Sequence, residues 1–278
     1  MGEKMNHKVF RTIDDQVCYL KANKAVKVDD MDLMRNMLLD NNYYNLISCG
    51  KIKFARHSEN GVHEYDESDF VEWIDYFEKD QEMSKHLIRN VLDFERKINS
   101  RVAYYIGELM ETGLLTEREQ EAIKHLIQSS RNVDGINFKL YSQCETWKYV
   151  TKMMFSDMKK LVFWLLENKY DFYVKIVKGY PFLEVNDVGK SSRFNRVRGR
   201  LNEINNLRNK LFHFTPLSIY LVYAKDSRGR LNNGEKRTIV KWVYRLSGNQ
   251  SRFSELNEIC NYSQKFVKMK KKPTINVD

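Results

Sequence analysis

The stretch SDFVEWIDYFEKDQEMSKHLIRNVLDFERKINSRVAYYIGELM, residues 68–110, is the longest continuous helical pattern in the chain. Its apolar residues recur at helical spacing and are Phe70, Trp73, Ile74, Phe77, Leu87, Val91, Phe94, Ile98, Val102, Tyr105 and Leu109. This spacing puts them on one face of a helix. The stretch contains no proline, and its first glycine is Gly107. It predicts one very long helix, or two helices separated near residue 80, ended by Gly113.

Start signals and apolar spacing predict further helices on both sides of this stretch. Thr12 is placed to cap a first helix, and Asp29 and Asp30 to cap a second. Thr116 and Glu119 have the spacing of a capping box, so another helix is expected to begin there. Further helices are expected over about 142–178, 190–213 and 251–269. Pro216 limits the helix of 190–213, because Thr215 before it is disfavoured in helical conformation.

Two regions leave room for β-structure. Residues 51–66 are polar and irregular and have room for a short hairpin. Residues 218–223 and 238–246 are rich in β-branched and aromatic residues, so a hairpin fits them, with helix as the alternative. The expected fold is mainly α, a helical bundle with helical additions and one small β-hairpin. Its expected organisation is an N-terminal helical segment, 1–66, packed on a main domain of residues 67–278, so that the chain forms one compact unit overall.

Composition favours the same fold class and a polyanionic partner. Three prolines and twelve glycines are too few for a sandwich or a barrel. The chain carries 47 lysines and arginines against 37 aspartates and glutamates, a formal charge of +10. Clustered positive charge favours binding to nucleic acid, because neutralised phosphates release their counterions. A basic protein without such a partner is the alternative.

The sequence also indicates the compartment. The four cysteines are widely spaced and form no CxxC pair, which favours free thiols in a reducing compartment. The N-terminus has no apolar signal segment, and no apolar stretch is long enough to span a bilayer. A cytoplasmic protein without membrane association is expected.

Familiar catalytic and metal-binding motifs do not occur in the sequence. It has no GxSxG, no glycine-rich phosphate loop and no HExxH, and its six histidines show no metal-ligand spacing. The interpretation is that no metal and no cofactor is used. Chemistry, if there is any, is then expected from protein side chains alone.

Two segments place an arginine shortly before a histidine. Arg118 and His125 share a helix face, but they lie among acidic residues and read as a solvated surface. Arg208 and His213 are about 140° apart on a straight helix and do not share a face. Asn209 does share a face with His213. His213 lies in the last turn, where Pro216 ends the helix, and a distorted helix end would bring its imidazole towards Arg208.

The chemistry that suits Arg208 and His213 is cleavage of an RNA backbone. A histidine can take the proton of a 2′-hydroxyl or protonate the leaving oxygen. An arginine can hold the phosphate and stabilise charge in the transition state. Asn209 would orient the arginine or a phosphate oxygen. The alternative reading is structural, with Arg208 in a salt bridge and His213 at a helix end.

A basic strip precedes this pair on the same predicted helix. Its members are Lys190, Arg193, Arg196, Arg198 and Arg200. No acidic residue lies between the four arginines, so the strip is interpreted as a path for RNA phosphates. A solvated helix face is the competing interpretation.

The segment LRNKLFH, residues 207–213, resembles the Arg-(polar)-x-His signature of HEPN domains, the higher eukaryote and prokaryote nucleotide-binding helical ribonucleases. The N-terminal half resembles the abortive-infection (Abi) family of bacterial phage-defence proteins, in its AbiD/AbiF-like branch. That resemblance rests on Gln16 and Leu20 followed by Asn42-Tyr43-Tyr44 and Leu46, on FVEWIDYF of residues 70–77, and on DFERKINSR of residues 93–101. It covers most of residues 9–215.

The resemblance implies a HEPN-type helical bundle that cleaves or binds RNA in phage defence. Arg208 and His213 would be the catalytic pair, and Asn209 the polar residue after the arginine. HEPN ribonucleases join two such motifs, so this single copy implies a homodimer. Relatives in this group associate with a small non-coding RNA, which makes a non-catalytic RNA-binding module one alternative. A sensor of phage components is another.

Glu95 lies on or beside the apolar face of residues 68–110. A carboxylate there needs a partner, and Arg208 and Arg101 are the candidates. A solvated position at the edge of the face is the alternative. Phe212 departs from the family pattern beside His213, where small residues are commoner, and this puts the access of substrate to the histidine in question.

Overall fold

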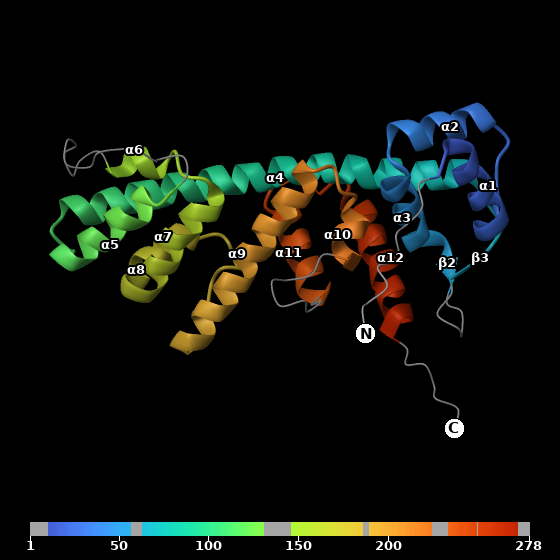
Figure 1. Cartoon of the computed structure of the whole chain (residues 1–278). Coiled ribbons are helices and arrows are strands. Elements are labelled where there is room, and N and C mark those ends of the chain that lie inside the picture. Colours follow the sequence, from blue (N-terminus) through green and yellow to red (C-terminus); the bar gives the residue numbers. More distant parts are fainter. Residues whose placement is uncertain are drawn as a thin grey trace, which may run out of the picture. The chain divides into compact units, whose positions relative to one another are not determined.

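The computed structural model describes residues 11–56, 63–130, 146–185, 189–223, 233–248 and 250–271. This part is mainly helical with a few very short strands (Figure 1), which confirms the expected fold class. The chain divides into two compact units. Unit 1 comprises residues 1–85, 213–237 and 251–278, and unit 2 comprises 86–212 and 238–250. The chain passes between the units four times. The domain boundary that the sequence suggested after residue 66 lies inside unit 1.

The opening stretch forms one helix, α4 (Phe70–Glu111), without a break near residue 80. Unit 1 contains its first part, in which Phe70, Trp73, Ile74 and Phe77 are buried. Unit 2 contains the rest, in which the residues from Leu87 to Leu109 at helical spacing are buried, except for the partly exposed Tyr105. Gly113 follows the helix with φ of 68°, a conformation that glycine adopts without strain.

Unit 1 is built from short helices and two pairs of two-residue strands. Its helices are α1 (Ile13–Lys24), α2 (Met31–Asp40), α3 (Tyr43–Phe54), α10 (Leu217–Tyr223), α12 (Phe253–Lys271) and the first parts of α4 and α11 (Asn233–Arg245). Helices α3, α10 and α12 pack against one another, and α1 packs on α2. Strand β1 (Val26–Lys27) pairs parallel with β4 (Ser68–Asp69). Strand β2 (Ala55–Arg56) pairs antiparallel with β3 (Glu64–Tyr65), a short hairpin within residues 51–66.

The expected helix starts are present in the structure. Thr12 caps α1, and its hydroxyl accepts from the amide of Asp15 while the Asp15 carboxylate accepts from the amide of Thr12. Asp30 caps α2. Thr116 and Glu119 form the predicted capping box at the start of α5. These local signals acted as expected because each satisfies amides that the first helical turn leaves without a partner.

Residues 218–223 and 238–246 do not form the hairpin that fitted their composition. They belong to α10 and α11, so the helical alternative is correct. Tyr220, Leu221 and Val222 are buried, as are Ile239, Val240 and Val243. Their burial explains the difference, because β-propensity largely reflects packing on a half-buried surface and yields to tertiary context. The segment expected between the two strands was 226–237. Its residues 233–237 belong to α11, and the others lie outside the described residues.

Unit 2 consists of helices alone in its described part. They are α5 (Glu117–Gln128), α6 (Thr146–Val150), α7 (Phe155–Asn168), α8 (Tyr170–Val177), α9 (Lys190–Phe212) and the later parts of α4 and α11. Helix α7 is central to this packing, because it contacts α5, α8 and α9. From α4, the ring of Phe94 contacts the rings of Phe155, Tyr180 and Phe182. These contacts place α9, which carries most of the predicted site residues.

A buried carboxylate stabilises the start of α10 in unit 1. Asp80, on α4, is fully buried and accepts hydrogen bonds from the amides of Leu217 (2.5 Å) and Ser218 (2.8 Å). Burial raises the pKa of Asp80 to about 6, although the hydrogen bonds from Ser218 act in the opposite direction. The carboxylate therefore compensates two helix-terminal amides at the cost of its own desolvation.

We expect Asp80 to make the chain less stable as pH rises. Its pKa increases from 3.8 to about 6 on folding, so its contribution is complete below about pH 4 and is lost as pH passes about 6. Urea unfolding from about pH 4 to about pH 7 should show the advantage of the native chain over Asp80→Asn shrinking by up to about 3 kcal/mol. Asp75→Asn, at an exposed position of α4, is the control. Parallel pH profiles for Asp80→Asn and the native chain would contradict the expectation.

Candidate functional site

Helix α9 positions the predicted site residues. It begins after Gly189, whose carbonyl accepts the first helical hydrogen bond from the amide of Arg193. Its apolar side is buried and consists of Val197, Leu201, Ile204, Leu207 and Leu211. Helix α7 packs against α9, and its buried Lys159 donates to the side-chain oxygen of Asn202 at 2.8 Å. Burial lowers the pKa of Lys159 to about 8. One face of α9 is therefore fixed, and its flanks present the polar residues.

Arg208 lies on one of these flanks and is held by three neighbours. Its Nε donates to the carboxylate of Glu95 on α4 at 3.0 Å. Its Nη1 donates to the side-chain oxygen of Asn209 at 3.3 Å. The guanidinium carbon lies 4.7 Å from the centre of the Phe212 ring. The side chains of Arg208 and Glu95 are only 25% and 14% exposed, so this is a half-buried ion pair.

The ion pair identifies the partner of Glu95 as Arg208, one of the two candidates. The other candidate, Arg101, donates to the carbonyl oxygens of Ile176 (2.9 Å) and Lys178 (2.7 Å) at the end of α8. It also lies 5.0 Å from the centre of the Tyr180 ring. Arg101 thus satisfies carbonyl groups that the helix end leaves without partners. Its observed contacts are structural.

The described contacts of Arg208 use only part of its hydrogen-bonding capacity. A guanidinium has five N–H donors, and the contacts with Glu95 and Asn209 use two of them. Glu95 fixes the orientation of the group but also neutralises part of its charge. Asn209 therefore orients the arginine, which was one of the two roles expected for it. The arrangement combines a positioned cation with a carboxylate that weakens its attraction for anions.

His213 is exposed and is the first residue after α9. The boundary between the units falls between Phe212 and His213, so Arg208 belongs to unit 2 and His213 to unit 1. The next residue, Phe214, has φ of 54° and is 77% exposed. A left-handed conformation is costly for a bulky residue, and it ends the helix before Pro216. Phe212, on the other side of His213, is 45% exposed.

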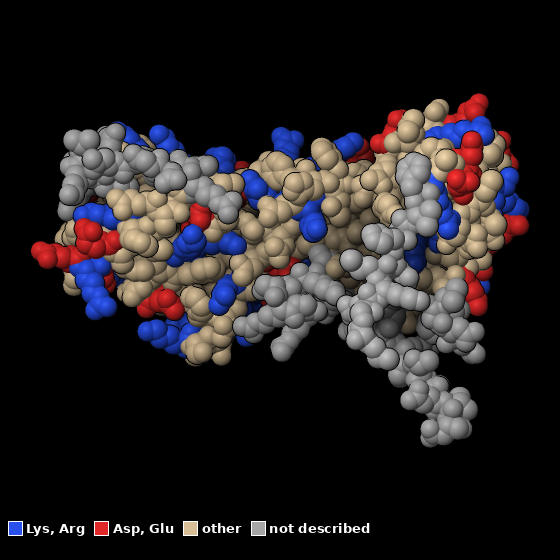
Figure 2. All heavy atoms as spheres, in the orientation of Figure 1, with Lys and Arg blue, Asp and Glu red and all other residues tan. Residues whose placement is uncertain are grey.

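The basic strip separates into two kinds of residue. Lys190, Arg196 and Arg198 are exposed. By contrast, Arg193 lies over the ring of Tyr170 at 4.5 Å, and Arg200 donates to the carbonyl oxygen of Phe182. In Figure 2, the face of unit 2 that includes α9 shows separate blue side chains on a tan surface. The exposed part of the strip therefore consists of Lys190, Arg196 and Arg198.

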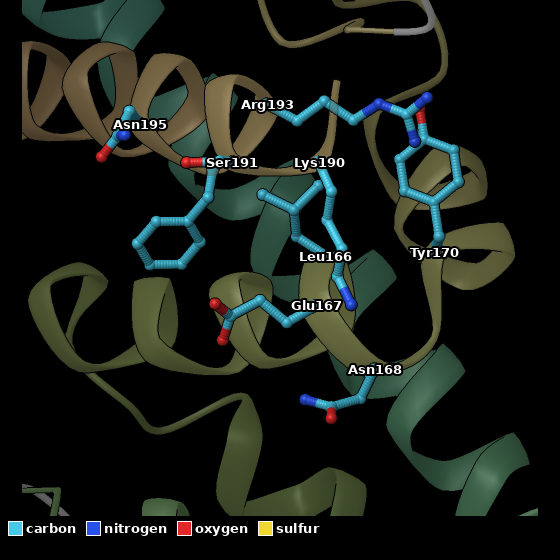
Figure 3. Close-up of a pocket in the computed structure, with 9 residues that line it drawn as sticks. Leu166, Glu167, Asn168, Tyr170, Lys190, Ser191, Arg193 and Asn195 are labelled. Carbon is cyan, nitrogen blue, oxygen red and sulfur yellow. The ribbon is translucent and has the colours of Figure 1, made fainter. Parts of the chain in front are cut away.

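A cavity near the start of α9 was not predicted. It has a volume of about 710 Å³, and its lining comes from the end of α7, the start of α8 and the first two turns of α9 (Figure 3). Lys190 and Arg193 line it, together with Glu167 and Tyr170. Lys190 and Arg193 were predicted from sequence as members of the basic strip. No sequence pattern near Glu167 or Tyr170 predicts that these two residues lie beside them. Their proximity results from the packing of α7 and α8 with α9.

Comparisons of the chain with protein-family models, with curated protein sequences and with solved structures give no match. Within the described part of the chain, no helix is both long enough and apolar enough to traverse a lipid bilayer.

We expect the Glu95–Arg208 pair to contribute more to stability than an exposed pair on the same helix. A double-mutant cycle with Glu95→Ala and Arg208→Ala, read by urea unfolding, should give a coupling energy of about 1–2 kcal/mol. The matched cycle uses Asp93 and Arg96, whose side chains are 43% and 71% exposed. Solvent screening should hold that coupling to roughly 0.5 kcal/mol or less. Equal coupling in both cycles would show that the half-burial of Glu95 and Arg208 has no energetic effect.

Proposed function

We propose that the chain is a HEPN-type endoribonuclease of the abortive-infection kind, which acts on RNA in bacterial phage defence without a metal ion. The observation that carries the proposal is the half-buried pair of Arg208 and Glu95, which holds an arginine in a fixed orientation five residues before an exposed histidine. A surface arginine that only keeps the protein soluble does not need a fixed orientation, whereas Arg208 is held by a carboxylate, an amide and an aromatic ring. An arginine that must meet a phosphate in a defined geometry gains orientation.

In the proposed reaction, the RNA supplies its own nucleophile. His213 takes the proton of the 2′-hydroxyl, and the 2′-oxygen attacks the adjacent phosphorus. The bond from phosphorus to the 5′-oxygen breaks, and that oxygen takes up the proton that His213 received, which returns the imidazole to its neutral form. The products are a 2′,3′-cyclic phosphate and a 5′-hydroxyl. Arg208 stabilises the charge that develops on the phosphate oxygens, with Glu95 and Asn209 as positioning residues.

A second copy of the chain is part of the proposal. HEPN ribonucleases, which residues 207–213 resemble, combine two Arg/His motifs, and this sequence contains one credible motif of that kind. Two chains would each supply one arginine and one histidine to a shared site. The exposed rings of Phe212 and Phe214 on either side of His213 provide apolar surface for such an association.

The exposed part of the basic strip is proposed as the approach for RNA. Arg196 and Arg198 lie on α9 upstream of Arg208, and both are exposed. Phosphate contacts of this kind give affinity and register without sequence specificity.

We expect Arg208→Ala and His213→Ala each to reduce RNA cleavage by at least about a thousandfold, because each removes a group that acts in the transition state. Cleavage is measured with purified full-length chain in EDTA, by the appearance of cyclic phosphate ends. Arg118→Ala and His125→Ala are the matched controls, since they change the other Arg/His pair, which is exposed on α5. These controls should retain the activity of the native chain.

The outcome that overturns catalysis is cleavage by Arg208→Ala and His213→Ala at the rate of the native chain. Circular dichroism and thermal unfolding of each variant show whether lost activity reflects lost fold. Arg208→Ala is the more sensitive variant in this respect, because it leaves Glu95 half-buried without its partner. Glu95→Gln provides a milder test of the positioning role. It should lower the rate while leaving the fold intact.

A second candidate is a non-catalytic RNA-binding module that associates with a small non-coding RNA. The observation that favours it is the same ion pair, because Glu95 neutralises part of the charge that a catalytic arginine would use. In this case the exposed arginines of α9 would matter and His213 would not. This candidate is favoured if His213→Ala leaves phage resistance normal and the charge reversal Arg196→Glu/Arg198→Glu abolishes it.

Both candidates predict that the exposed arginines of α9 bind RNA. The double variant Arg196→Glu/Arg198→Glu should weaken binding of single-stranded RNA by roughly tenfold or more and flatten its salt dependence. Fluorescence anisotropy over a series of salt concentrations measures both quantities. The control is Arg89→Glu/Arg118→Glu, which makes the same charge change at exposed positions of α4 and α5. Equal losses in the two double variants would show that net charge alone determines RNA binding.

A further inference from the structure

The cavity at the start of α9 has the size of a ligand site and is open to solvent. Its volume of about 710 Å³ lies within the range of small-molecule pockets. All of its lining residues belong to unit 2. In Figure 3 the side chain of Lys190 extends from α9 towards the end of α7, where Glu167 and Asn168 lie. The guanidinium of Arg193 lies beside the ring of Tyr170 on another side.

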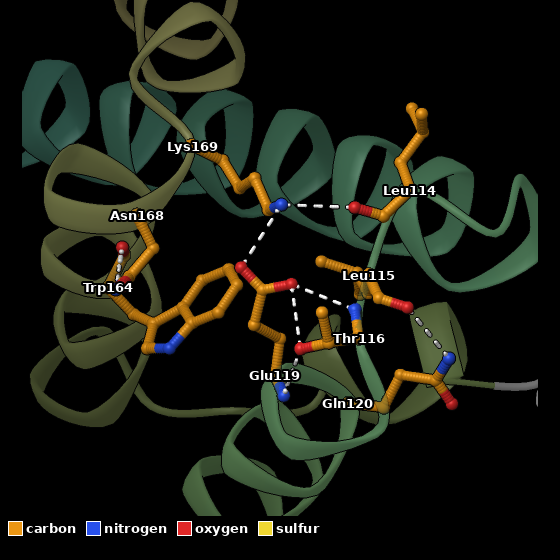
Figure 4. A network of polar contacts seen from close by, with 8 residues as sticks. All are labelled: Leu114, Leu115, Thr116, Glu119, Gln120, Trp164, Asn168 and Lys169. Atoms are coloured by element: carbon orange, nitrogen blue, oxygen red, sulfur yellow. Dashed lines mark hydrogen bonds and ion pairs between the residues drawn. The ribbon is translucent and has the colours of Figure 1, made fainter.

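Contacts outside the cavity hold its walls in place. Lys169 separates α7 from α8, and its Nζ donates to the carbonyl oxygen of Leu114 (3.0 Å) and pairs with Glu119 (3.1 Å) (Figure 4). The hydrogen bond from the amide of Thr116 and the contact with Lys169 lower the pKa of Glu119. The junction that carries Asn168 and Tyr170 is thereby tied to the start of α5. The cavity wall does not depend on a ligand for its position.

Aromatic contacts hold the rest of the lining. The ring of Tyr170 stacks with that of Tyr173, a buried residue of α8, at a centroid distance of 5.9 Å. Phe194, which lines the cavity from α9, contacts the ring of Phe163 on α7 at 5.6 Å. Two aromatic rings therefore border the cavity from different helices. Planar ligands stack on such rings.

The lining combines three chemical features that rarely serve one simple ligand. Lys190 and Arg193 supply positive charge, Phe194 supplies ring surface, and Glu167 and Asn168 supply hydrogen-bonding groups. The ring of Tyr170 is already in contact with Arg193 and Tyr173. A free inorganic anion would gain nothing from the rings and would be repelled by Glu167. An apolar ligand would leave the charged groups unused. A nucleotide has a phosphate for the cations, a base for the rings and a sugar or base edge for the carboxylate and amide.

We propose that this cavity binds a nucleotide, held as one unit of a single-stranded RNA. Lys190 and Arg193 of the cavity lie on the first two turns of α9, and the exposed Arg196 and Arg198 follow within the next turn of the same helix. RNA that follows these arginines would place a base beside Phe194 and Asn168. The proposal concerns binding, and it holds whether or not Arg208 and His213 cleave RNA.

The test measures binding of a short fluorescein-labelled single-stranded RNA to the full-length chain by anisotropy. Every variant carries His213→Ala, so that the proposed cleavage does not consume the probe. Asn195→Trp fills the cavity from an exposed lining position without changing charge. Lys190→Glu reverses a cation in the lining, and Arg89→Glu makes the same charge change at an exposed position of α4 outside it. Thermal unfolding verifies the fold of each variant.

We expect Asn195→Trp and Lys190→Glu to weaken RNA binding roughly tenfold, the effect of losing one stacked base, while Arg89→Glu changes it much less. A titration with unlabelled AMP distinguishes the source of the nucleotide. Weak competition by AMP supports a unit held within an RNA strand. Tight AMP binding that Asn195→Trp abolishes, with RNA binding unchanged, overturns the RNA assignment in favour of a free nucleotide. Unchanged binding of both probes by Asn195→Trp overturns the site altogether.

Discussion

Burial of the apolar face of α4 is the constraint on which the rest of the structure depends. In unit 1, Trp73 of this face lies so close to α3 that a Cβ on Gly50 would be 2.2 Å from its ring. Phe54 stacks on the same ring. In unit 2, Phe94 is enclosed by three other rings. Since Phe94 is fixed, the next residue, Glu95, is turned by one helical step to the flank of the face, where it meets Arg208. The ion pair of the candidate site thus follows from core packing.

Features set by neighbouring residues could be predicted from sequence, and features set by packing could not. The long helix and the capping boxes of Thr12 and Thr116 depend on residues within one or two turns. The segments in α10 and α11 were ambiguous, because β-branched and aromatic residues suit any buried surface. In the candidate site, sequence reduced the partner of Glu95 to two arginines, and the structure selected Arg208. Neither the engagement of Arg200 by Phe182 nor the cavity had a local signal.

The candidate site contains opposing electrostatic effects. A carboxylate beside an arginine stabilises the cation in the folded chain and fixes its direction, but it competes with any incoming phosphate. Arg196 and Arg198, on the same helix, are exposed, and the described interactions include no carboxylate contact for either of them. Their positive charge is therefore not reduced in this way. Under the proposed function, affinity for RNA and orientation at the phosphate would come from different residues on one helix. This division of roles is compatible with a nuclease and also with a binding module.

The passage of the chain back and forth between the units has a consequence for biosynthesis. Unit 2 is complete only when residues 238–250 have been added, and unit 1 only when 251–278, including α12, have followed. Since a ribosome releases a chain from its N-terminal side onward, unit 2 lacks part of its helices until α11 is made, and unit 1 until α12 is made. A nascent or prematurely ended chain therefore exposes the apolar faces of α3 and α10 that α12 covers. Unit 1, whose first residues are made before those of unit 2, is therefore the unit that is completed last.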